Sequence, residues 1–254
     1  MTATNQGDGN TEPPSISAAA ASLFRPLGFW ASILWLAIAV VVSVLAVVLL
    51  LVIAGLTTNI DVLKDEIVVE ITAPIVALVF VAVLVSAVRR IEWSASDYFA
   101  MVLPTRQALV IAFIGTCIIA LIEELLTLYF IPDWGDFGIG LTDFRAVRAA
   151  GTALVALYCF NLVIVTPIIE EIAFRGFLYR GWSSPPLGPR AAIVLTAVVF
   201  GAAHVQYSWL GMVDVGVSAL FLGWLRWRSD SIIPSMLSHA TMNVAALISL
   251  ALAA

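Results

Sequence analysis

The sequence is poor in charged residues, which make up only 11% of its 254 positions. Soluble globular chains carry about 25% charged and about 45–50% apolar residues, whereas this chain is 62% hydrophobic. A soluble core does not account for that balance. A lipid bilayer does, because a helix that faces lipid needs no polar face. The shortage of charge therefore excludes an ordinary soluble domain and predicts an integral, multi-pass membrane protein.

Basic residues and cysteines are scarce as well. The chain has 12 Lys and Arg against 17 Asp and Glu, a formal net charge of −5. No basic patch is dense enough to hold a phosphate backbone, which excludes nucleic acid as a partner. Its two cysteines, Cys117 and Cys159, lie in apolar runs without CxxC spacing. We expect them to be small buried apolar residues rather than a disulfide or a metal pair.

Long apolar runs occupy most of the chain. A helix needs about 20 apolar residues to cross a bilayer core about 30 Å thick. The sequence therefore predicts an all-α fold, a polytopic transmembrane helical bundle of about seven spans (six to eight). The expected spans are residues 30–56, 70–88, 108–131, 149–178, 190–206, 209–227 and 232–252. The segment 94–106 is a candidate kink or interfacial helix, and residues 1–25 are expected to form a flexible cytoplasmic tail.

The positions of the basic residues predict the orientation, because cytoplasmic loops carry an excess of Lys and Arg. With the N-terminus inside, the outer side receives only Lys64, Arg145 and Arg148. The cytoplasmic side receives Arg25, Arg89, Arg90, Arg106, Arg180, Arg190, Arg226 and Arg228. This bias, together with the absence of a targeting sequence, favours the plasma membrane of a prokaryote with a cytoplasmic N-terminus. An aromatic belt is expected at the span ends, from Trp30, Trp182, Trp224 and Trp227.

The first of three polar clusters lies in the long span 149–178. A charge in hydrocarbon costs about 2.5–3.5 kcal/mol on insertion scales, so each one needs a partner or a function. Glu171 and Arg175 are four residues apart and can neutralise each other on one helix face. Glu170 lies about 100° around the helix from Glu171 and is free to point elsewhere. A carboxylate in such a dry, apolar site suits general-base work.

The other two clusters hold the only two histidines of the chain. One is Phe200 to His204, where the small residues 201–203 would allow a neighbouring helix to approach closely. The other runs from His239 to Asn243, which are one turn apart and share a helix face. A single His or Asn in a membrane helix more often joins helices than catalyses a reaction. Glu, His, His and Asn together on three spans nevertheless favour a catalytic site.

These clusters, EExxxR, FxxxH and HxxxN, resemble the three motifs of the CAAX-protease and bacteriocin-processing (CPBP) family of intramembrane endopeptidases. The resemblance covers about residues 147–250 and implies peptide hydrolysis inside the membrane. It implies that Glu170 and His204 activate water and that His239 and Asn243 stabilise the oxyanion. It also implies that Glu171 and Arg175 hold the Glu170 helix in place and that Phe200 packs beside His204.

Two further expectations follow from the resemblance. One is a division into N-terminal transmembrane helices (26–146) and a catalytic helical core (147–254). The other is a membrane-associated protein or peptide substrate, with or without a lipid at its C-terminus.

Zinc is possible, with Glu170, His204 and His239 as three protein ligands. No HExxH motif is present, and the amide of Asn243 is better suited to donate to an oxyanion than to bind zinc. A mechanism without a cofactor is therefore favoured.

Alternative functions have weaker support. Ser218 and His239 resemble the nucleophile and base of a serine protease, but the second Gly of a nucleophile elbow is missing. A transporter would usually show two related halves, whereas the polar residues here lie in the second half. A non-catalytic membrane scaffold or immunity factor that retains the motifs for packing stays open. Glu123 and Glu124 are expected to be structural or solvated. Asp214, a costly charge in the sixth span, either pairs with a polar neighbour or lines the cavity.

Overall fold

The computed structural model describes residues 25–53, 65–129 and 139–253. Helices make up 84% of the structure, and the described residues contain no strand, which confirms the predicted helical bundle. The predicted cytoplasmic tail lies almost entirely outside the described residues. The division of the chain at residues 146 and 147 stays a prediction.

Six helices are long and apolar enough to cross a membrane among the described residues, and a shorter apolar helix joins them. This confirms a bundle of about seven spans. Five of them are single helices: α2 (Phe29–Ile53), α3 (Glu66–Arg89), α5 (Arg106–Tyr129), α11 (Trp209–Ser229) and α12 (Ile233–Ala253). The sixth is a composite helix over Thr152–Trp182. The shorter one is α10 (Gly188–Ala203).

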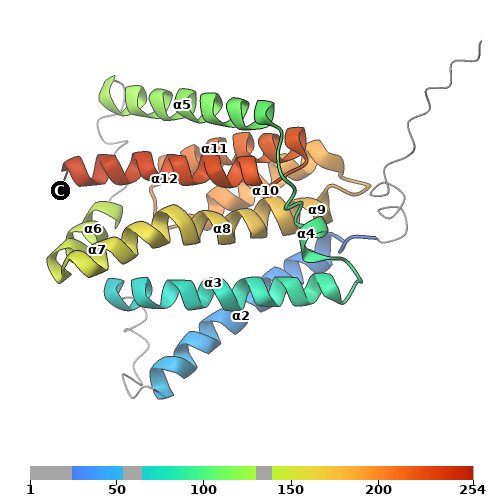
Figure 1. Ribbon diagram of the computed structural model, residues 1–254, viewed down its shortest axis with the longest axis horizontal. Helices are drawn as coiled ribbons and strands as arrows, with labels where there is room; N and C mark the ends of the chain where they lie inside the picture. The colour runs from blue at the N-terminus through green and yellow to red at the C-terminus, as the bar shows by residue number, and fades with distance from the viewer. Residues whose placement is uncertain (1–24, 54–64, 130–138, 254) are drawn as a thin grey trace, which may run out of the picture.

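The composite helix lies at the centre of the bundle, between α12 on one side and α3 on the other (Figure 1). Helix α5 covers α12 and α11, while α2 crosses α3 obliquely at the opposite edge (Figure 1). Two short helices lie outside the spans. They are α4 (Ala95–Tyr98), inside the segment 94–106, and α6 (Ile139–Ala150). They lie at opposite ends of the bundle (Figure 1).

Two π-helical segments interrupt the composite helix. Its order is α7 (Thr152–Phe160), η2 (Asn161–Val165), α8 (Thr166–Glu171), η3 (Ile172–Leu178) and α9 (Tyr179–Trp182). A π segment widens the turn, so that an N–H donates to the carbonyl five residues back, and such segments frequently occur at functional sites. The two π segments flank α8, the turn that carries Glu170 and Glu171.

Each π segment leaves one backbone carbonyl without its usual helical partner. In η2 the N–H of Thr166 donates to Asn161 O rather than to Leu162 O. The next residue, Pro167, has no N–H to offer. In η3 the N–H of Tyr179 contacts the carbonyls of Phe174 and Gly176 and bypasses Arg175 O. The carbonyls of Leu162 and Arg175 are thus open to side-chain donors from neighbouring helices.

Two predictions about side-chain placement are wrong. Trp182 is buried at 3% exposure and donates its indole N–H to Ser32 Oγ at 2.9 Å, so it joins α9 to α2 rather than forming an interfacial belt. Cys117 is exposed on α5 rather than buried, although both cysteines are free as expected. A weakly polar thiol can face lipid at little cost, so the apolar run around Cys117 did not require burial inside the protein.

Candidate active site

A buried ion pair forms the base of the site. Arg175 Nη1 donates to Glu171 Oε1 at 2.8 Å, and both side chains are almost fully buried. The second guanidinium nitrogen of Arg175 donates to the backbone carbonyl of Ala219 on α11 at 3.0 Å. The guanidinium also lies over the ring of Phe200, with Cζ 4.7 Å from the ring centroid. Arg175 therefore neutralises Glu171 and joins the composite helix to α10 and α11.

His239 of α12 lies between the two glutamates. Its Nδ1 is 3.0 Å from Glu171 Oε1, and its Nε2 is 3.6 Å from Glu170 Oε2. Since Glu171 also accepts from Arg175, it is a carboxylate acceptor, and Nδ1–H is the donor to it. That hydrogen bond fixes the orientation of the ring and directs Nε2 towards Glu170. The Glu170 side chain is 26% exposed, whereas Glu171 is at 0%, so only Glu170 is accessible to a substrate.

His204 occupies the position directly after α10. The predicted span continued to residue 206, but α10 ends at Ala203, and His204 leaves the helix with φ −88° and ψ 47°. Its Nδ1 lies 2.7 Å from Phe200 O. With that carbonyl as acceptor, Nδ1 carries the proton and Nε2 is left as a proton acceptor. His204 also lies within Coulombic range of Glu170.

The ring of Phe200 lies near both histidines. Its centroid is 4.7 Å from that of His204 and 5.9 Å from that of His239. One residue further along α10, a Cβ added at Gly201 would lie 2.6 Å from Met212 O. Glycine is therefore required for α11 to approach α10 this closely. The close approach places α11 beside Phe200, the aromatic residue that lies near both histidines.

Asn243 contacts a different part of the composite helix. Its amide nitrogen donates to Leu162 O at 2.7 Å, the carbonyl that Pro167 leaves without a backbone donor. His239 and Asn243 thus share one face of α12, as their spacing predicts. They reach the composite helix at separate points, however, with His239 at Glu171 and Asn243 at the carbonyl of Leu162. The polar contact of Asn243 joins α12 to η2 rather than to a glutamate.

The three candidate zinc ligands do not form a ligand set in this structure. Glu170 lies near Nε2 of His239, but the described residues contain no group of three His, Cys, Asp or Glu side chains close enough to hold one metal ion. The Nδ1 of His204 is engaged by the backbone carbonyl of Phe200. The arrangement of these three residues therefore does not fit a tetrahedral metal site.

Ser218, the nucleophile of the serine-protease alternative, is bonded to a glutamate of α5 rather than to His239. Its hydroxyl donates to Glu123 Oε1 of α5 at 2.8 Å. Asp214 is near enough to act electrostatically on the Glu123 carboxylate. The hydrogen bond between Ser218 and Glu123 thus joins α11 to α5, apart from the polar contacts of the glutamate pair. Without a histidine base at Ser218, the serine alternative has no geometric support.

Sequence analysis missed Arg226, which it placed among the cytoplasmic basic residues. Arg226 is buried at 1% exposure in the last turns of α11 and donates to the backbone carbonyl of Arg175 at 3.2 Å. The one sign of this burial in the sequence is that Arg226 lies between the apolar residues Leu225 and Trp227. That signal is weak, because arginines at span ends usually extend to the interface.

Part of the second half of the chain matches a known family model. Residues 151–245 match the family model described as type II CAAX prenyl endopeptidase, Rce1-like. The match includes all three motif clusters and lies inside the predicted catalytic core, and it confirms the family suggested by the motifs. Neither a curated protein nor a solved structure matches the chain.

Proposed function

We propose that this chain, whose residues 151–245 are a CAAX-protease-family domain of the Rce1-like type, hydrolyses peptide bonds of membrane-associated substrates through Glu170. The family supports an intramembrane endopeptidase in general. The observation that carries the specific proposal is the position of His239 between two glutamates of which one is buried and ion-paired and the other is partly exposed. A partly exposed carboxylate beside an oriented imidazole can move protons at a bound substrate.

In the proposed reaction, Glu170 and Nε2 of His204 hold a water molecule. Glu170 accepts a proton as the water oxygen attacks the scissile carbonyl carbon. The C–N bond then breaks, and the same proton passes from Glu170 to the leaving amine. With both of its ring nitrogens protonated, His239 donates from Nε2 to the oxyanion, and the Nδ1–H bond to Glu171 holds its ring in place. Preorganised donors of this kind are effective because a buried site has a low dielectric constant.

Asn243 is proposed as a second oxyanion donor. One N–H of its amide is engaged by Leu162 O, which leaves the other N–H for a substrate. The same bond would hold the side chain in one rotamer, so little entropy is lost when a substrate binds. The substrates proposed are membrane-associated proteins or peptides with a C-terminal prenyl group, as the description of the matching family indicates.

We propose that the end of the bundle with α4 and α9 faces the cytoplasm of a prokaryotic cell. Arg89 and Arg90 are the last residue and the C-cap of α3, which ends there, and Arg180 lies in α9. Helix α6 with Arg145 and Arg148 lies at the other end (Figure 1). In a variant without native cysteines, a membrane-impermeant maleimide should label Ala149→Cys in intact spheroplasts. Leu187→Cys should react only after permeabilisation. The opposite labelling pattern would overturn the orientation.

The test of the activity uses protein in liposomes and a farnesylated peptide that ends in a CAAX sequence. Mass spectrometry should detect a released C-terminal fragment. His204→Ala should lower the rate by roughly 10²- to 10³-fold, within the range for loss of a general acid–base group. Val205→Ala, on the exposed next residue, is the matched control. Full activity in His204→Ala would disprove its role. A wild-type protein inactive on prenylated and unprenylated peptides alike would favour the scaffold function.

A further inference from the structure

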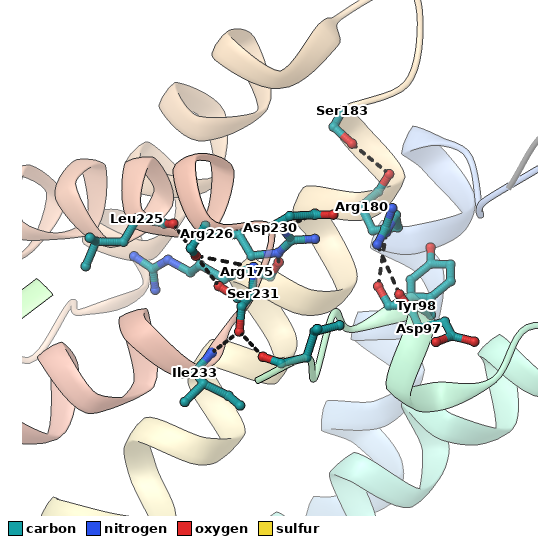
Figure 2. Close-up of polar contacts among 12 residues, drawn as sticks. Asp97, Tyr98, Arg175, Arg180, Ser183, Leu225, Arg226, Asp230, Ser231 and Ile233 are labelled. Carbon is teal, nitrogen blue, oxygen red and sulfur yellow. Dashed lines mark hydrogen bonds and ion pairs between the residues drawn. The ribbon is translucent and has the colours of Figure 1, made fainter. Parts of the chain in front are cut away.

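Arg226 contacts the composite helix from α11. Figure 2 shows its side chain directed at the backbone of Arg175 and at Asp230. Arg226 Nε donates to Arg175 O at 3.2 Å, and Nη1 donates to Asp230 Oδ1 at 2.8 Å. The guanidinium also lies over the ring of Tyr179, with Cζ 5.0 Å from the centroid. The contacts of this buried cation with Arg175 O and with the Tyr179 ring thus hold η3 and the start of α9 against the end of α11, while Asp230 holds the guanidinium from the end of α11 itself.

The contact with Arg175 O compensates for a specific defect in the composite helix. In an α-helix this carbonyl would accept from Tyr179 N–H, but that N–H contacts Phe174 O and Gly176 O instead. A buried carbonyl without a donor is costly, and Arg226 supplies the donor. In η2, Asn243 does the same for Leu162 O. The turn that carries Glu170 is thus held on both sides, by a side chain of α12 before it and one of α11 after it.

A continuous chain of contacts joins Arg226 to Glu170. Arg226 holds the backbone of Arg175, and the Arg175 side chain holds Glu171 at 2.8 Å. Glu171 orients His239 at 3.0 Å, and His239 directs Nε2 at Glu170. We infer that Arg226 is a positioning residue: it fixes the segment that carries Arg175 and thereby sets the orientation of His239 towards Glu170. The effect of Arg226 on the reaction rate rests on the proposed function of the Glu170 site.

Asp230 fixes the far side of the Arg226 guanidinium. It is the C-cap of α11, in the left-handed conformation with φ 49°, and its side chain is 86% exposed. The next two residues hold the connection between α4 and α5: Ser231 Oγ donates to Val102 O, and Ile232 N donates to Ala100 O. An exposed residue can be replaced without opening a cavity. Asp230→Ala therefore disturbs Arg226 while leaving the core intact.

The chain contains only two histidines, so histidine-selective ¹⁵N labelling gives spectra with two imidazole groups. NMR in nanodiscs compares the wild type with Arg226→Gln and Asp230→Ala, and uses Arg228→Gln, an exposed arginine on the same helix, as the matched control. The Nδ1–H signal of His239, assigned by its loss in His239→Gln, should shift in Arg226→Gln and, in the same direction but less, in Asp230→Ala. It should stay unchanged in Arg228→Gln.

An unchanged His239 signal in Arg226→Gln and Asp230→Ala would overturn the inference. If Arg226→Gln does not fold, Asp230→Ala decides alone. This measurement needs no substrate, so it tests the positioning role even if the wild type cleaves no peptide, which would contradict only the proposed function.

Hydrolysis of the farnesylated CAAX peptide gives a second measurement. Arg226→Gln should lower kcat by roughly 10- to 100-fold with KM within about threefold, because displacement of a reacting group by about 1 Å can cost about 10²-fold in rate. Arg226→Lys keeps the charge and should recover part of kcat. Arg228→Gln should match the wild type. A variant that folds with wild-type kcat, or that changes KM alone, would show that Arg226 does not position the site.

Discussion

Glu170→Gln is expected to lower peptide hydrolysis by about 10²- to 10⁴-fold, the range assigned to a positioned general acid–base group. The amide has nearly the shape of the carboxylate, but it cannot accept the proton of the attacking water. Glu170 is the partly exposed member of the glutamate pair, so its loss should affect the reaction rather than the packing. The measurement is the initial rate of fragment release from a farnesylated CAAX peptide in liposomes.

The same substitution should leave the fold intact or stabilise it slightly. Glu170 Oε2 is buried without a hydrogen-bond partner, so the charge is an electrostatic cost that a neutral amide reduces. Thermal unfolding of the purified protein should therefore give a Tm at or above that of the wild type. Glu124→Gln, an exposed glutamate of α5, is the matched control and should keep full activity. Wild-type rates in Glu170→Gln would rule out glutamate catalysis here and favour a scaffold.

The sequence predicted the spans and the local pairs because both depend on short-range rules. Hydrophobic runs of about 20 residues identify helices that cross a bilayer, and the four-residue spacing of Glu171 and Arg175 placed their side chains together. The same spacing put His239 and Asn243 on one face of α12. The family motifs gave the residues of the site, although their catalytic roles stay proposals.

The parts that sequence analysis missed depend on contacts between distant segments. The π segments arise where Pro167 removes a donor and where Arg226 and Asn243 supply donors from α11 and α12. No local pattern predicts that combination. Trp182 was expected at the interface because it ends a span, but Ser32 of α2 provides a buried acceptor for its N–H. Placement near a span end thus did not indicate which side of the helix faces the core.

Arg175→Met is expected to destabilise the protein by about 3–5 kcal/mol, the usual cost of removing one partner of a buried ion pair. Methionine fills most of the volume, so the main loss is electrostatic. Glu171 would remain at 0% exposure without the cation that neutralises it. The free energy of unfolding, or the folded yield after size-exclusion chromatography, should fall strongly. Arg228→Met, at an exposed position of α11, should leave both unchanged.

A second substitution separates a structural from a chemical role for this pair. Glu171→Gln in the Arg175→Met background removes the buried charge left behind and should recover a large part of the lost stability, since a buried pair is often no more stable than neutral residues of similar size. Activity should not recover, because a neutral amide in place of the Glu171 carboxylate no longer orients an imidazolium at His239. Normal yield with selective loss of activity in Arg175→Met would instead place Arg175 in the reaction itself. Recovery of both stability and activity in the double variant would show that the pair matters only for packing.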